Sequence, residues 1–180
     1  MRRSSFDKLV SWVGVVLTIV FLVAGVLLLQ GANFAKNTVT EQLTAQNIAF
    51  DADASKLPPE LASWAGVAVT DGAAAKAYSD LIAVHVAGAT GGKSYSQVSG
   101  QWFADGKPGP SADQNKPTSY DLRMTAFMGE TLRGMLLNAY AFWTLGTIAF
   151  WAAIGAFAAA IVMLILSILG FKAAGKNAEA

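Results

Sequence analysis

The sequence contains no cysteine and a single histidine, and these two shortages exclude several kinds of chemistry. Without cysteine the chain cannot form disulfides, bind a metal through thiolates or use a cysteine nucleophile. With His85 alone, one chain cannot build a metal site that needs two histidine ligands. The net charge of +1 offers no electrostatic surface for nucleic acid. We therefore expect no enzyme activity, no metal or other cofactor and no nucleic-acid partner.

Charged residues are also scarce, at 14% of the chain, whereas soluble domains usually have about a quarter. Apolar residues make up 54%, and the mean hydropathy is +0.43. A soluble domain of 180 residues would need more charge to stay in solution. The composition therefore predicts an integral membrane protein, with the lipid bilayer as its first partner.

Two long runs carry no charged residue at all. The first, from Leu9 to Ala35, is 27 residues long, and a helix needs only ~20 apolar residues to cross a bilayer. A cleaved signal peptide is the alternative, but this run exceeds the usual apolar length of ~7–15 residues. The second run, from Gly134 to Phe171, is 38 residues long. It holds either two tight spans or one span with a helical stalk, and the absence of proline and of a polar turn favours one span.

Basic residues flank both spans on the side of the chain ends, because Arg2, Arg3 and Lys8 precede the first span and Lys172 and Lys176 follow the second. Cytoplasmic flanks are usually rich in lysine and arginine. We therefore expect a plasma-membrane protein with both termini in the cytoplasm. The predicted order is a cytoplasmic tail (1–8), a first span (9–30), an extracytoplasmic helical domain (31–117), a stalk helix (118–145), a second span (146–170) and a cytoplasmic tail (171–180).

The segment between the spans is predicted to be all-α, because no run alternates with a strand's period of two. The first helix continues in pattern to about Ile48, and Pro58-Pro59 follows as a break. We expect Thr70 to cap a helix over 71–87 that ends at Gly88, and Ser94 to cap a short helix after it. Thr118 and Asp121 resemble a capping box, which opens a helix that runs to about residue 171.

Four polar residues are candidates for a site. Glu130 and Arg133 lie three residues apart just before the second charge-free run, and Asn138 follows five residues later. They indicate either a polar site near the outer membrane surface or a simple intrahelical ion pair, and we favour the ion pair. His85 shares a helix face with Tyr78 and Ile82, so we expect a packed core histidine. Tyr140, Trp143 and Trp151 are interpreted as anchors at the membrane interface.

Small residues recur along one face of each span, which is typical of closely packed membrane helices. In the second span the spacing of three and four residues links Gly146, Ala149, Ala153, Ala156 and Ala160. In the first span it links Gly14, Thr18 and Gly25, with Phe21 between them. The simplest use is packing of the two spans as an antiparallel hairpin. Ala152, Gly155 and Ala159 lie on other faces, which leaves a homo-oligomer or a larger membrane complex open.

The segment from Met128 to Trp143, MGETLRGMLLNAYAFW, resembles a segment of small actinobacterial membrane proteins of unknown function. The stretches RRSSFDKLVSWVG, TAQNIAF and AKAYSDLIAVHVAGATGGKSYSQVSGQ fit the same pattern, so the resemblance covers most of the chain. It implies two spans and an outer helical domain. Members of this family are sometimes labelled aromatic ring-opening dioxygenases. The label implies an iron ion bound by two histidines and an acidic residue, and this chain cannot supply the two histidines.

The sequence thus favours a non-enzymatic membrane protein of the cell envelope, with an interaction, accessory or assembly role. The alternative is a subunit of a homo-oligomeric channel or transporter, supported by the small-residue faces. An enzyme is a remote third hypothesis, because no nucleophile with a base and no metal-ligand set is evident.

Overall fold

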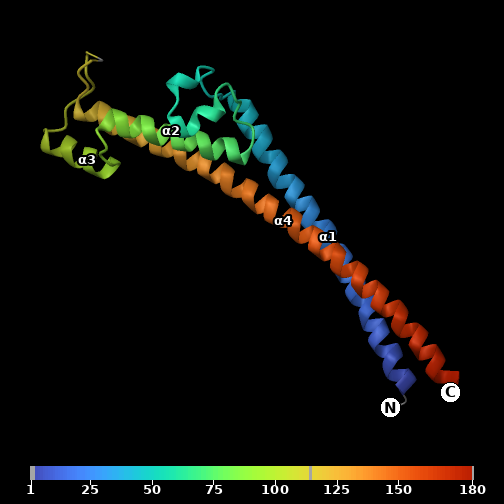
Figure 1. Cartoon of the computed structure of the whole chain (residues 1–180). Helices are drawn as coiled ribbons and strands as arrows, with labels where there is room; N and C mark the ends of the chain where they lie inside the picture. Colours follow the sequence, from blue (N-terminus) through green and yellow to red (C-terminus); the bar gives the residue numbers. More distant parts are fainter. Residues whose placement is uncertain (1–2, 114, 180) are drawn as a thin grey trace. The chain divides into compact units, whose positions relative to one another are not determined.

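Long helices dominate the computed structural model of the chain, which describes residues 3–113 and 115–179. The helices are α1 (Arg3–Gln46), α2 (Gly72–Thr90), α3 (Tyr95–Ala104) and α4 (Ser119–Glu179) (Figure 1). Two short 3-10 helices, η1 (Ala54–Lys56) and η2 (Pro59–Trp64), follow α1 in the chain. The described residues contain no strand, only an isolated bridge between Ala49 and Ala68. The predicted all-helical fold is confirmed.

The chain divides into two units, which are described separately below. One unit combines Met1–Lys36 with Leu145–Ala180, and we call its described part the helix pair. The other unit, Asn37–Thr144, is called the middle unit. Both long helices are shared between the units, because α1 passes from the helix pair into the middle unit and α4 passes back.

The core of the middle unit forms where the segment after α1 folds over the first half of α2. Phe50 is stacked on Trp64, with ring centroids 5.7 Å apart, and meets Tyr78 edge to face at 5.0 Å. Backbone hydrogen bonds from Phe50 to Val67 and from Val69 to Ile48 hold this segment together. Each fully buried Leu or Phe contributes roughly 1.5–3 kcal/mol. The remaining core residues include Val39, Leu43, Leu57, Leu61, Leu81 and Leu136.

The bounds of α2 differ from the predicted 71–87 at both ends. Asp71, not Thr70, is the N-cap, because its carboxylate accepts a hydrogen bond from the Ala74 amide at 2.8 Å. The helix also runs through Gly88 to Thr90 and is capped by Gly91, which adopts a left-handed conformation with φ of 62°. A helix ends where a residue accepts the left-handed turn, and sequence alone did not show which of three nearby glycines does so.

The two later helix starts are as predicted. Ser94 caps α3 with a full capping box. Its side chain accepts a hydrogen bond from the Gln97 amide, and its own amide donates to the Gln97 side-chain oxygen. Before α4, the Asp121 carboxylate accepts hydrogen bonds from the amides of Thr118 and Ser111 and from the Thr118 hydroxyl. These donors, the Thr118 amide first, hold the pKa of Asp121 below its usual value. The helix then continues to Glu179, beyond the predicted end near residue 171.

The helix pair is apolar on its outside. Among the described residues, two helices are long and apolar enough to cross a membrane, with mean hydropathies of 2.8 and 2.7 in their most apolar windows. Large side chains such as Trp12, Leu27, Trp151 and Ile161 are more than half exposed. The buried positions are instead small or polar ones, including Ser11, Thr18, Ala153 and Ser167.

Candidate functional site

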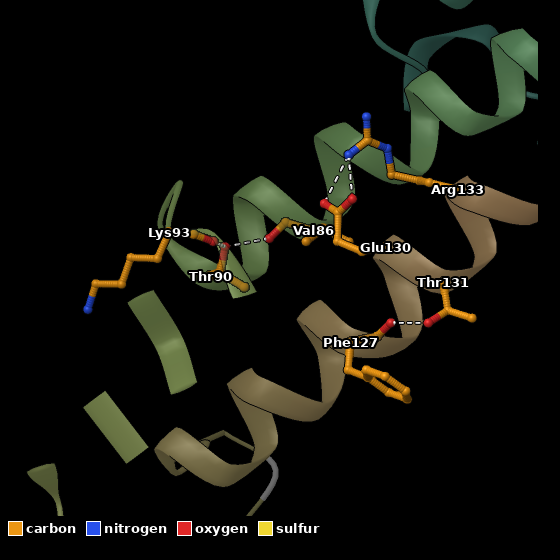
Figure 2. A network of polar contacts seen from close by, with 7 residues as sticks. All are labelled: Val86, Thr90, Lys93, Phe127, Glu130, Thr131 and Arg133. Atoms are coloured by element: carbon orange, nitrogen blue, oxygen red, sulfur yellow. Dashed lines mark hydrogen bonds and ion pairs between the residues drawn. The ribbon is translucent and has the colours of Figure 1, made fainter. Parts of the chain in front are cut away.

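Glu130 and Arg133 form an ion pair along one face of α4. The Arg133 Nη1 atom donates to both carboxylate oxygens of Glu130, at 2.9 and 2.8 Å (Figure 2). The Glu130 side chain is 49% exposed and that of Arg133 28%. Such an exposed intrahelical pair is worth a few tenths of a kcal/mol. Its geometry is that of the intrahelical pair favoured in the sequence analysis.

The structure does not bring the other two polar candidates to this pair in the part of the chain that it describes. Asn138 is exposed on α4, and His85 is exposed on α2. The expectation that His85 is a packed core residue is therefore wrong. The core cluster covers α2 only as far as Leu81 and Ile82, so the face that carries His85 is left open one turn later. Periodicity identified the face, but it does not say how far the covering segment reaches.

Trp143 also differs from its predicted role as an interfacial anchor. Its ring packs against the core of the middle unit, and its Cβ atom stands where a side chain at Gly72 would have to lie. Trp151 and Tyr140 are exposed, as an anchor requires. The sequence signal that could have shown this is Gly72 at the start of α2. Its lack of a side chain makes room for the Trp143 indole on α4.

A polar and aromatic cluster that the sequence analysis missed joins α3 to the start of α4. Arg123 donates from Nε to the Ser99 hydroxyl at 3.2 Å and from Nη2 to the Tyr95 hydroxyl at 3.4 Å. The guanidinium carbon lies 4.4 Å from the centre of the Trp102 ring, which is a cation–π contact. Hydrogen bonds from Ser99 and then from Arg123 lower the pKa of Tyr95. All of these residues anchor α3 to α4, so we assign the cluster a structural role.

The predicted packing residues of the two spans lie as follows. Gly14, Thr18, Gly25, Gly146, Ala153 and Ala160 are buried in the helix pair, and Ala149 and Ala156 are half-buried. Gly25 faces the Phe157 ring, whose Cε1 atom lies 2.7 Å from the place of a Cβ atom. Gly146 faces the Ala32 carbonyl oxygen at 3.2 Å. Gly146, the first of the packing residues in α4, thus meets Ala32, which lies in the later part of α1.

The tightest contacts of the helix pair come from a motif that the sequence analysis did not identify. Ser-x-x-Gly occurs in α1 at Ser11 and Gly14, and again in α4 at Ser167 and Gly170. The Ser167 side chain occupies the space beside Gly14, and the Ser11 side chain occupies the space beside Gly170. Each serine hydroxyl also donates to its own helix, at 2.7 Å, to the carbonyls of Asp7 and Met163 respectively. The two motifs therefore interlock reciprocally without leaving a polar hydrogen unpaired.

No group of three or more acidic or histidine side chains in residues 3–113 and 115–179 could hold a metal ion. Comparisons of the chain with protein-family models, with curated proteins and with solved structures found no match.

Proposed function

We propose that the protein spans the membrane twice, as a helix pair, and presents the middle unit outside the cell as a docking module for a protein partner. The exposed apolar surface of the helix pair supports insertion. In water each large exposed apolar side chain would forgo ~1.5–3 kcal/mol of burial, whereas lipid removes that loss. Two helices can span a bilayer because their backbone hydrogen bonds are all internal.

The extent of the membrane segment follows from the charged residues and the contacts between the helices. Lys36 ends the charge-free run of α1, and its side chain contacts Gly146 and lies over the Phe150 ring. At the other end Ser11 meets Gly170, two residues before Lys172. These features support a bilayer segment at about 9–35 of α1 and 146–171 of α4, which at 1.5 Å per residue are each ~40 Å long. This matches a bilayer with its headgroup regions.

A topology experiment tests the proposed orientation, which the basic flanks support. Because the chain has no cysteine, single cysteines can be introduced at Ser4, Ala112 and Ala178 without background labelling. An impermeant maleimide added to intact cells should label the cysteine at 112 alone. Lysed cells provide the control, since all three cysteines should then react. Labelling at 178 but not at 4 in intact cells would require an odd number of spans and would refute the two-span arrangement, whereas labelling at both 4 and 178 would refute the proposed orientation.

The docking role rests on one observation, the exposed apolar face of α4 just before the proposed span. Residues 134–144 carry no charge, yet they belong to the middle unit and lie outside the proposed lipid segment. Met135 is 66% exposed and Phe142 52%. At 100° per residue these side chains share a face, with Asn138 at its centre. Exposed contiguous apolar surface of this kind marks interaction sites in soluble segments.

A photo-crosslinking amino acid at Asn138 should capture a partner protein in intact cells. The matched control is Tyr140, which is 40% exposed and lies two residues further on, on the opposite face of the same helix. We expect an adduct from 138 and none from 140, and Met135→Lys should abolish it. Equal adducts from both positions, or an adduct that survives Met135→Lys, would rule out a specific docking face.

A subunit of a homo-oligomeric channel or transporter is the alternative function, and one observation favours it. Gly155 is exposed in the helix pair and has no atom within 4 Å of the place of a Cβ atom. Together with exposed Ala152 it leaves a small-residue face where another copy could approach closely. If the adduct at 138 proves to be a second copy of the chain, this alternative replaces a separate partner.

A further inference from the structure

A groove opens on one face of the helix pair, at the end that carries the chain termini. It encloses about 220 Å³ and lies between the first turns of α1 and the last turns of α4. The interlocked Ser-x-x-Gly motifs form part of its lining, through Ser11 and Gly14 on α1 and Ser167 and Gly170 on α4. Phe6, Val10 and Leu166 line its walls. The two helices also meet where Trp12 packs edge to face against Phe171, with ring centroids 5.7 Å apart.

The chemistry of the lining suits hydrocarbon. The hydroxyls of Ser11 and Ser167 are already hydrogen-bonded to their own helices, so they offer no unpaired donor to a polar ligand. Apart from Asp7 and the two serines, the side chains that line the groove are apolar. In a bilayer such a groove does not stay empty, because the atoms that line it would lack dispersion contacts on one side. An acyl chain of a neighbouring lipid restores these contacts against the apolar side chains.

The charges around the groove select the headgroup of that lipid. Lys8, Lys172 and Lys176 are exposed on the turns that flank the groove, and Arg2 and Arg3 precede them in the sequence. Asp7 lines the groove as its one acidic residue. Clustered basic residues next to a membrane span attract anionic lipids. The excess of positive charge therefore complements a phosphate headgroup that carries a net negative charge.

We infer that this groove binds an anionic phospholipid, with one acyl chain in the groove beside the interlocked Ser-x-x-Gly motifs and the phosphate near Lys8 and Lys172. The inference rests on the proposed membrane insertion, which places this end of the helix pair at the inner headgroup region. The site is then a lipid-selective contact of the inner leaflet, separate from the docking face of the middle unit.

Native mass spectrometry of the full chain, released from detergent with added lipid, tests the site. The two probes are phosphatidylglycerol and phosphatidylethanolamine with identical acyl chains. We expect at least a tenfold preference for the anionic lipid in the number of retained adducts. The double variant Lys8→Gln with Lys172→Gln should reduce that preference at least fivefold, whereas Lys116→Gln in the middle unit should not change it. Equal retention of both lipids by the unmodified protein would overturn the inference.

Two groove-filling variants test where the acyl chain lies. Val10 lines the groove from α1 and Ala173 lines it from α4, so Ala173→Phe and Val10→Phe should each remove the adduct of both lipids. The matched control is Ala158→Phe, at an exposed position of α4 outside the groove. Adducts that survive both variants overturn the inference, as does dimerisation of the chain through the groove. Because the maleimide labelling reports insertion independently, correct labelling without selective lipid retention would refute the lipid site alone.

Discussion

Replacing Ala153 with leucine should lower the melting temperature of the detergent-solubilised protein, whereas Ile154→Leu should leave it nearly unchanged. Ala153 is 1% exposed within the helix pair, so a longer side chain has no free space. Overpacking of this kind typically costs ~1–3 kcal/mol. Helix pairs in lipid or detergent depend on close contact, because the apolar surroundings provide no hydrophobic drive for association.

The neighbouring position is a stringent control for this experiment. Ile154 is 42% exposed, and its replacement by leucine conserves volume, so the control introduces the same residue in the same detergent without adding atoms. The measurement is thermal unfolding followed by circular dichroism or by loss of the monodisperse peak. If the two variants unfold at the same temperature, the small-residue face does not hold the helices together, and its alanines reflect composition only.

The elements of this fold could be predicted from sequence where the deciding signal is local. Charge-free length predicted the two long apolar helices, and side chains at fixed offsets predicted the starts of α3 and α4. The predicted end of α2 was wrong because Gly88, Gly91 and Gly92 lie close together, and each glycine could end a helix. Which one does so depends on which backbone carbonyls still lack a partner. A few local residues thus determine where a helix forms, but small differences between neighbouring residues determine where it ends.

The contacts between elements were harder to predict, because they depend on register. Gly14 was identified as a packing residue, but the serine that fills its space, Ser167, lies more than 150 residues away in the sequence. Aligning the two Ser-x-x-Gly motifs in opposite directions would have given this register. His85 and Trp143 show the complementary problem. Their exposure and burial follow from how far neighbouring segments extend over α2, which no local pattern encodes.

Two glycines of α4, five residues apart, should respond oppositely to alanine. Gly129→Ala should destabilise the middle unit, because the added Cβ atom would overlap the Val86 Cγ2 atom on α2. Valine is held in one rotamer in a helix, so Val86 cannot turn aside and the helices must separate. The expected cost is ~1–3 kcal/mol, offset in part by the better helix propensity of alanine.

Gly134→Ala adds the same atom to the same helix where no other atom lies within 4 Å of it. Only the backbone effect remains there, so we expect stabilisation by roughly 0.5–1 kcal/mol. Chemical or thermal unfolding of both variants in one detergent gives the comparison. Opposite signs require that α2 and α4 touch at Gly129. Stabilisation by both substitutions would show that α2 does not pack there, because the helix propensity gain would then be the same at the two sites.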